Sequence, residues 1–239
     1  MAKTTPSSEH IRNMFDRLAS RYDIFNHLTS LGMAVAWRKE VLRPLEDGMR
    51  VLDLGCGTGD LAIMAAQKIR GSGEVVGLDF SPQMLAFAEE RVKKLGLNGL
   101  GSLRFVLKKA EELPLENDKP YDWVVSGFVL RNLYEHIDRV LSGTYQSLKK
   151  GGGISFLDIT EPPNPAALWF WRIYMNTLVG LYGKILFGKN YPVFYLTESA
   201  HRFFKASDFV KKLAAAGFKN VQARSFMLGT VTLYQAVKE

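Results

Sequence analysis

Glycines and carboxylates gather in one short stretch of this sequence. Gly55, Gly57 and Gly59 alternate with other residues, and Asp53 and Asp60 stand on either side of them. Glycine has no Cβ and can take a positive φ, so such a turn lets a ligand approach the backbone closely. Two carboxylates would repel the phosphates of a nucleotide and attract a ligand that carries positive charge. The spacing therefore favours a cationic ligand at this turn.

Another carboxylate ends the next apolar run. Residues 74–78 predict a strand, which Asp79 and then Phe80 follow. An acid at the end of the second strand of a Rossmann-like unit can accept hydrogen bonds from a ribose. A tight turn without a ligand and a nucleotide-phosphate site remain as alternatives, and Asp79 argues against the first of them.

Strands and helices alternate between residues 50 and 159. Apolar runs predict strands at 50–54, 74–78, 103–107, 123–126 and 154–159, and helical periodicity predicts helices at 60–70, 82–95 and 135–148. We expect the glycines at 151–153 to end the last of these helices. Such alternation predicts an α/β fold with a mostly parallel sheet, helices on both faces and a ligand at the carboxyl ends of the strands.

An aromatic stretch interrupts this pattern after the fifth predicted strand. Residues 166–204 are rich in Trp, Tyr and Phe, which either a packed helical subregion or an apolar substrate pocket would explain. We expect a single domain with a helical cap at 1–45, a Rossmann-like core at 46–161 and a helical lid at 162–205. Residues 206–239 then complete the core with a helix at 207–216 and strands at 218–225 and 230–237.

Composition narrows the class of protein further. The chain has 239 residues, a formal net charge of +7 and one cysteine, Cys56, which excludes a disulfide within the chain. Its flanking acids should raise the pKa of that thiol, so we interpret Cys56 as a small filler. No group of histidines and cysteines has metal-ligand spacing, so we expect no metal. Residues 1–10 lack a signal sequence, and Arg172 and Lys184 interrupt the longest apolar run, so we expect a cytoplasmic protein without a membrane span.

Three blocks of sequence resemble the ubiquinone/menaquinone biosynthesis C-methyltransferases, a family of class I S-adenosylmethionine-dependent methyltransferases. They are M-F-D-R-L-A-S-R-Y-D-I-F-N at 14–26, F-V-L-R-N at 128–132 and Y-L-T-E-S at 195–199. The resemblance implies a class I sheet whose last strand is antiparallel, with S-adenosylmethionine as cofactor. It implies cofactor contacts from Asp53, Gly55, Gly57, Thr58, Gly59, Asp79, Phe80, Lys109, Ala110 and Tyr22. The family usually has Asp or Asn where this chain has Lys109, so the adenine must find hydrogen bonds elsewhere.

The implied reaction methylates a ring carbon of a polyprenylated quinol, most simply demethylmenaquinol or a benzoquinol of the ubiquinone pathway. Such a carbon becomes nucleophilic when a phenolic proton leaves. We expect Arg131 to stabilise the phenolate and Asn132 to orient the ring. The candidate bases are His27, Asp23, Tyr195 and His201. An ion pair with Glu135 is the structural alternative for Arg131.

Competing interpretations remain. The chain could methylate another small lipid or phenol, or be an inactive scaffold with this fold. A nucleic-acid methyltransferase is disfavoured, because Glu161-Pro162-Pro163-Asn164 follows the fifth predicted strand rather than the fourth. The expected partners are a lipid-tailed quinol, the inner membrane surface by transient contact, no nucleic acid, and a second copy if the protein forms a homodimer.

Overall fold

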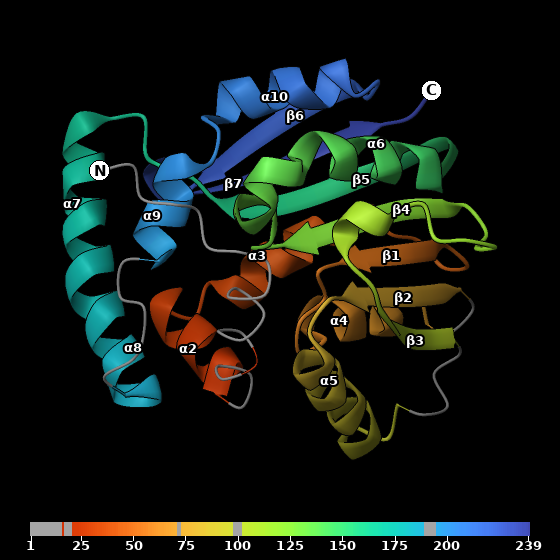
Figure 1. Cartoon of the computed structure of the whole chain (residues 1–239), viewed down its shortest axis with the longest axis horizontal. Coiled ribbons are helices and arrows are strands. Elements are labelled where there is room, and N and C mark those ends of the chain that lie inside the picture. Colours follow the sequence, from red (N-terminus) through yellow and green to blue (C-terminus); the bar gives the residue numbers. More distant parts are fainter. Residues whose placement is uncertain (1–15, 17–20, 71–72, 98–101, 189–194) are drawn as a thin grey trace.

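A seven-stranded sheet in the order β3-β2-β1-β4-β5-β7-β6 forms the centre of the computed structural model (Figure 1). The structure describes residue 16 and residues 21–70, 73–97, 102–188 and 195–239. The strands are β1 (Arg50–Leu54), β2 (Glu74–Asp79), β3 (Ser102–Leu107), β4 (Tyr121–Gly127), β5 (Leu148–Ile159), β6 (Lys219–Phe226) and β7 (Val231–Val237). Strands β1 to β5 pair in parallel, and β7 is antiparallel to both of its neighbours. The predicted sheet, with its antiparallel last strand, is confirmed.

Helices cover both faces of the sheet. One face packs against α3 (Ala34–Val41), α4 (Asp60–Lys68) and α5 (Pro82–Lys94), and the other packs against α6 (Ile137–Ser147) and α10 (Ala206–Ala215). Successive side chains on a strand point to opposite faces of the sheet. Val51 of β1 therefore packs in the same cluster as α3, α4 and α5, whereas Leu52 and Leu54 pack in the cluster with α6 and α10. Short η3 (Ala110–Glu112), η4 (Leu130–His136) and η6 (Met227–Gly229) connect these elements.

A third group of helices lies beyond the carboxyl ends of the parallel strands. It consists of α2 (Tyr22–Thr29), α7 (Pro165–Tyr174), the π-helical η5 (Met175–Val179), α8 (Gly180–Phe187) and α9 (Tyr195–Arg202). The segments α7, η5 and α8 run along the edge of the molecule, and α2 and α9 lie between them and the sheet (Figure 1). Helices thus occupy the described parts of the predicted cap and of the predicted insertion, whereas most of residues 1–20 and residues 189–194 lie outside the described residues. Among the described residues, no helix is both long and apolar enough to cross a bilayer.

The glycines at 151–153 do not end a helix, contrary to the prediction. Helix α6 ends at Ser147 and β5 begins at Leu148, so these glycines lie inside the strand. A Cβ on Gly153 would lie 2.4 Å from the indole ring of Trp123 on β4. Glycine is therefore needed here because a neighbouring side chain lies against the backbone of the strand.

Candidate active site

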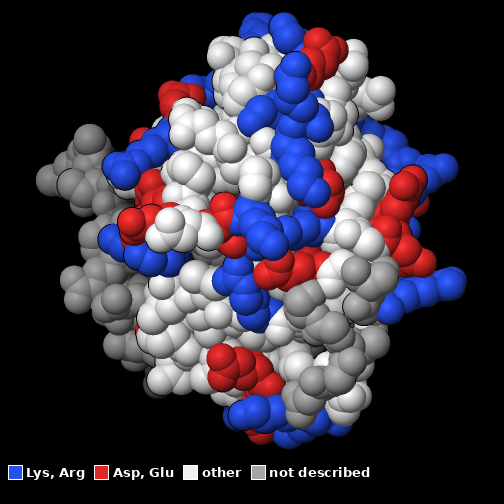
Figure 2. Space-filling model, turned by 90° about the vertical axis from the view of Figure 1, so that its right-hand side faces the viewer, with Lys and Arg blue, Asp and Glu red and all other residues white. Residues whose placement is uncertain are grey.

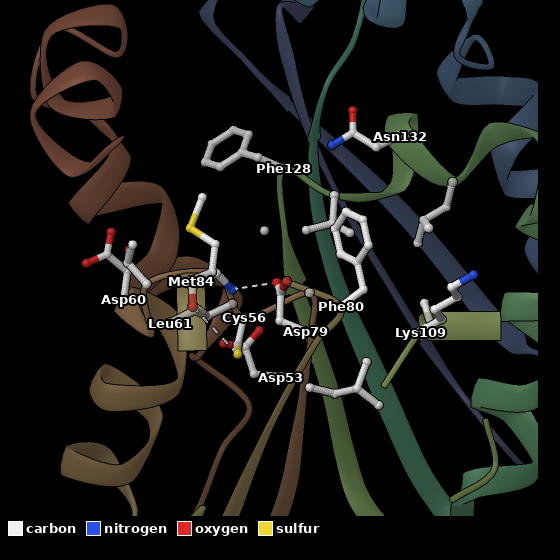
Figure 3. A pocket seen from close by; sticks show the side chains of 18 of the residues that line it. Asp53, Cys56, Asp60, Leu61, Asp79, Phe80, Met84, Lys109, Phe128 and Asn132 are labelled. Carbon is white, nitrogen blue, oxygen red and sulfur yellow. Dashed lines mark hydrogen bonds between the residues drawn. The ribbon is translucent and has the colours of Figure 1, made fainter. Parts of the chain in front are cut away.

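A cavity opens at the carboxyl ends of β1, β2 and β4 (Figure 3). Most of the predicted cofactor residues line it, namely Asp53, Gly55, Gly57, Thr58, Asp79, Phe80, Lys109 and Ala110. Gly59 is not among the residues that line it. It is the left-handed N-cap of α4, with φ of +84°, and a Cβ there would meet Ala88 at 3.0 Å. Neighbouring parallel strands end at one edge of a sheet, which is why residues so far apart in sequence meet here.

The glycine turn is tied to the neighbouring strand and has one tight side. The backbone N–H groups of Gly55 and Cys56 donate to the carbonyl of Leu78 at 2.8 and 2.9 Å. A Cβ on Gly55 would lie 2.6 Å from both γ-carbons of Val129, whereas one on Gly57 would meet nothing within 4 Å. Gly57 therefore leaves space open on the side that faces the cavity.

Asp79 lies at the middle of the cavity floor (Figure 3). Its Oδ2 accepts the backbone N–H of Gly57 at 2.8 Å, and its Oδ1 accepts that of Ser81 at 2.9 Å. Burial raises the pKa of Asp79. A carboxylate oxygen can accept more than one hydrogen bond, so both remain able to accept hydroxyl donors such as those of a ribose.

Asp53 holds the least satisfied polar atom of the site. Its side chain is 1 % exposed, and its Oδ2 has no hydrogen-bond partner. Burial, and then repulsion from Asp79, raises the pKa of Asp53 to about 8. A buried carboxylate oxygen of this kind is costly unless it is paired, so the site fits a ligand that brings a cation to Asp53.

The other acid beside the glycine turn has arginine partners. Asp60 pairs with Arg38 at 2.9 Å and with Arg91 at 2.5 Å, which compensate part of its charge. Asp60 also lines the cavity, so its attraction for a ligand cation stays a prediction. Arg38 also lines the cavity, with its side chain only 11 % exposed, although no pattern in the sequence predicted a role for it. The cavity thus presents the guanidinium of Arg38 as well as the carboxylates of Asp53, Asp60, Asp79 and Glu111.

Arg131 does not stand at the open edge of the site, contrary to the prediction. Its side chain is 2 % exposed, and its Nη1 donates to Asp158 Oδ1 at 2.7 Å and to the carbonyl of Phe128 at 2.6 Å. Its backbone N–H donates to Asp158 Oδ2 at 2.9 Å. Glu135, the expected alternative partner, is not involved in these contacts. Arg131 therefore holds the segment after β4 in place from behind the cavity.

Two of the predicted catalytic residues do lie together. Asn132 lines the cavity, and the hydroxyl of Tyr195 on α9 donates to its Oδ1 at 2.9 Å. His27 is exposed on α2 and is not among the residues that line the cavity. Tyr22 begins α2, but its side chain falls outside the described part of the chain.

The remaining walls of the cavity are mostly apolar. Phe128, Val129 and Met84 contribute to these walls. Among the described histidines, His136 lines the cavity. Burial raises the pKa of the Cys56 thiol well above its usual value, with Asp53 and Asp79 adding to the effect, which confirms the prediction for this residue. Within the residues that the structure describes, no cluster of histidine, cysteine and carboxylate side chains is suited to hold a metal ion.

A sheet of this order, with an acid-flanked glycine turn and a carboxylate at the end of β2, defines a class I methyltransferase that uses S-adenosylmethionine. Comparison with known proteins assigns the chain within that class. The sequence pattern described as the ubiE/COQ5 methyltransferase family matches residues 3–238, and the chain belongs to this family.

Individual relatives agree with this assignment. The chain is 34% identical over 233 residues to the demethylmenaquinone methyltransferase of Bacillus cytotoxicus, covering 96% of each chain. Among solved structures it is similar to a SAM-dependent methyltransferase from Aquifex aeolicus, with a TM-score of 0.62 and 19% identity over 95% of this chain and 98% of that one. A possible histamine N-methyltransferase from Thermotoga maritima matches with a TM-score of 0.62, 20% identity and 96% and 100% coverage. Such distant structural likeness supports the fold alone, so the sequence relationship has to guide the substrate.

The unpaired oxygen of Asp53 leads to a prediction about pH. Below about pH 8 the free protein holds a proton on Asp53, and a ligand cation would favour the ionised form. Binding of S-adenosylmethionine should then release a proton, so the association constant should rise with pH, by at most about tenfold per unit, between about pH 6 and pH 8. Calorimetry in buffers with different ionisation enthalpies measures both the slope and the proton release.

The matched variant is Asp53→Asn, which keeps the shape of the side chain and removes its titration. The ligand's own titration is common to both proteins and cancels in the ratio of their affinities. The ratio of the wild-type association constant to that of Asp53→Asn should therefore rise with pH. A ratio that stays constant would show that Asp53 does not face the cation.

Proposed function

We propose that this protein transfers a methyl group from S-adenosylmethionine to a ring carbon of a lipid-tailed quinol, with demethylmenaquinol as the substrate to test first. The observation that carries the proposal is the similarity, over nearly the full length of both chains, to a relative named demethylmenaquinone methyltransferase. The polar groups of the cavity are consistent with this chemistry.

The charges in the cavity fit the two ends of the cofactor. S-adenosylmethionine supplies an electrophilic methyl group on a sulfonium, and its amino-acid end carries both an ammonium and a carboxylate. Asp53 would hold the ammonium, Arg38 would hold the carboxylate, and Asp79 would accept the ribose hydroxyls. Phe80 and Ala110 would contact the adenine.

Asn132 and Tyr195 would position the quinol. Asn132 lines the cavity from η4, and the hydroxyl of Tyr195 on α9 holds its amide by a hydrogen bond. A quinol hydroxyl held there has a defined orientation, and loss of its proton makes the neighbouring ring carbon electron-rich. Phe128 and Val129 supply an apolar wall that keeps water away from that carbon.

A polyprenyl tail keeps such a quinol in the bilayer. The substrate can then be reached only from the membrane surface, so we place the enzyme at the inner face of the membrane, in peripheral contact with it. A positively charged protein is attracted to the anionic lipids of that face, and the net charge of +7 supports this location.

Radioactive methyl transfer tests the function. The protein is incubated with labelled S-adenosylmethionine and either reduced demethylmenaquinone or a reduced polyprenyl benzoquinone, and the lipid extract is counted. We expect label in the first lipid, and none when the quinone is left oxidised. Binding of S-adenosylmethionine without label in either reduced lipid would contradict the proposal and favour another substrate or an inactive scaffold.

Tyr195→Phe should lower kcat about 10- to 100-fold and leave the KM for S-adenosylmethionine unchanged. The substitution removes the hydroxyl that fixes Asn132, so the quinol loses its orientation rather than its affinity for the site. Tyr174→Phe is the matched control, because it deletes a hydroxyl that donates to the carbonyl of Thr29 on a neighbouring helix. An equal loss of kcat in both variants would show that Tyr195 has no specific role.

A further inference from the structure

The helix formed by α7, η5 and α8 has a continuous apolar surface on its outer side. Six of its large apolar side chains are between 42 % and 66 % exposed: Trp169, Phe170, Ile173, Leu178, Leu181 and Ile185. We call these six residues the outer face. Monomeric proteins expose single apolar side chains routinely, but a row of them along one helix indicates a surface that contacts another apolar phase.

The opposite side of the same helix is packed. Trp171, Met175 and Val179 are buried in a cluster with Phe25 of α2 and Ala200 of α9. Their spacing of four residues places them on one side of the helix, away from the outer face. The exposure of the outer face is therefore a property of an ordered helix that already has its partners on the other side.

Charge distinguishes this helix from the side of the molecule that faces away from it. Residues 165–187 contain Arg172 and Lys184 and no Asp or Glu. On the side of the molecule away from α7 and α8, by contrast, basic and acidic side chains lie close together (Figure 2). Arg172 pairs at 3.0 Å with Glu161, which precedes the helix. The helix itself thus combines apolar and aromatic side chains with two cations, a combination that matches the boundary between lipid tails and anionic headgroups.

We propose that the outer face binds an anionic lipid bilayer, with the helix lying in the plane of the membrane surface. This inference rests on the proposed function, because a lipid-tailed quinol has to be taken from the bilayer. A second copy of the chain is a poorer occupant, since the helix carries cations and no carboxylate with which a symmetric copy could pair.

The position of the helix also links the membrane to the cavity. Helix α2 packs against α7 and η5 through Phe25, and its next residue, Asn26, lines the cavity. One layer of helices therefore separates the outer face from the site. A bilayer held at the outer face would bring the quinol to the edge of the cavity while its tail stays in lipid.

Sedimentation with vesicles of phosphatidylglycerol and phosphatidylcholine tests the surface. The variant Phe170→Glu/Ile185→Glu places two carboxylates on the outer face at side chains that are each 66 % exposed, so the fold should be kept. We expect the wild-type protein to bind the vesicles and the variant to bind at least about tenfold more weakly, since it loses two membrane-inserted side chains.

Leu95→Glu/Leu228→Glu is the matched control. It adds the same two charges at side chains that are 51 % and 81 % exposed, on the end of α5 and on η6. The control should bind vesicles as the wild type does. Equal binding by all three proteins, or an equal loss in both variants, would overturn the proposal, as would a wild-type protein that does not sediment with vesicles. Ultracentrifugation that finds a wild-type dimer and a monomeric Phe170→Glu/Ile185→Glu variant, without vesicle binding, would assign the outer face to a second copy instead.

Methyl transfer to a short-tailed, water-soluble quinol separates this inference from the proposed function. The Phe170→Glu/Ile185→Glu variant should methylate that quinol at the wild-type rate, because the substrate no longer comes from a membrane. A protein that binds vesicles through the outer face but methylates no quinol would contradict the proposed function and support the proposed membrane-binding surface. A protein that methylates the soluble quinol but binds no vesicles would contradict the proposed membrane-binding surface and support the proposed function.

Discussion

Replacing Arg131 with alanine should lower the free energy of unfolding by about 3–5 kcal/mol, because it leaves a charged partner buried without its cation. That partner is Asp158, whose side chain is 0 % exposed and bonds to both the guanidinium and the backbone of Arg131. The loss corresponds to a fall in Tm on the order of 10 °C for a chain of this size. Urea unfolding followed by circular dichroism measures it.

Arg224→Ala is the control for this experiment. Arg224 is also paired with a carboxylate, that of Glu40, but its side chain is 50 % exposed. Water compensates an exposed charge, so this variant should change stability by less than about 1 kcal/mol. If Arg131→Ala were as stable as the control and had lost only turnover, Arg131 would have to reach the substrate directly, and the buried role described above would be wrong.

Gly57→Ala should weaken the binding of S-adenosylmethionine about 100-fold while the protein remains folded. The added methyl group meets no protein atom within 4 Å, so it enters space that the cofactor needs. The positive φ of +54° costs about 1–2 kcal/mol for a residue with a Cβ, which a chain of this size tolerates. Calorimetry gives the affinity, and thermal unfolding shows that the fold is kept.

Gly55→Ala makes a sharp comparison. It also has a positive φ, but its Cβ would collide with both γ-carbons of Val129 at 2.6 Å. This variant should lose stability as well as affinity, and Gly55→Ala/Val129→Ala should regain part of the stability because the collision is relieved. Wild-type affinity in Gly57→Ala would show that the cofactor does not lie against this turn.

The elements of the fold could be predicted where a local pattern determines them. Strand β1 occupies the predicted residues 50–54, because an apolar run there ends at a glycine turn. The prediction was wrong at the start of β5, where the glycines at 151–153 resemble a helix stop. For Gly153 the actual reason is the ring of Trp123 on the adjacent strand, and no local pattern reveals such a neighbour.

The same distinction between local pattern and distant neighbour applies to the residues of the site. Residues at the ends of parallel strands, such as Asp53 and Asp79, could be placed because the topology brings those ends together. Ion pairs between separate elements could not be predicted from the sequence. The partner of Arg131 lies 27 residues away on β5, and Asp60 pairs with arginines of two other helices, so neither pairing leaves a periodic signal in the sequence.

The position of β7 has a consequence for how the protein is made. In the described part of the chain, β6 is hydrogen-bonded within the sheet to β7 alone, although β6 comes first in the sequence. A nascent chain that ends before Val231 therefore carries an unpaired strand and leaves the outer side of β5 open. A chain released at that point by premature termination would expose two unpaired strand edges at once, which makes such a fragment prone to aggregation.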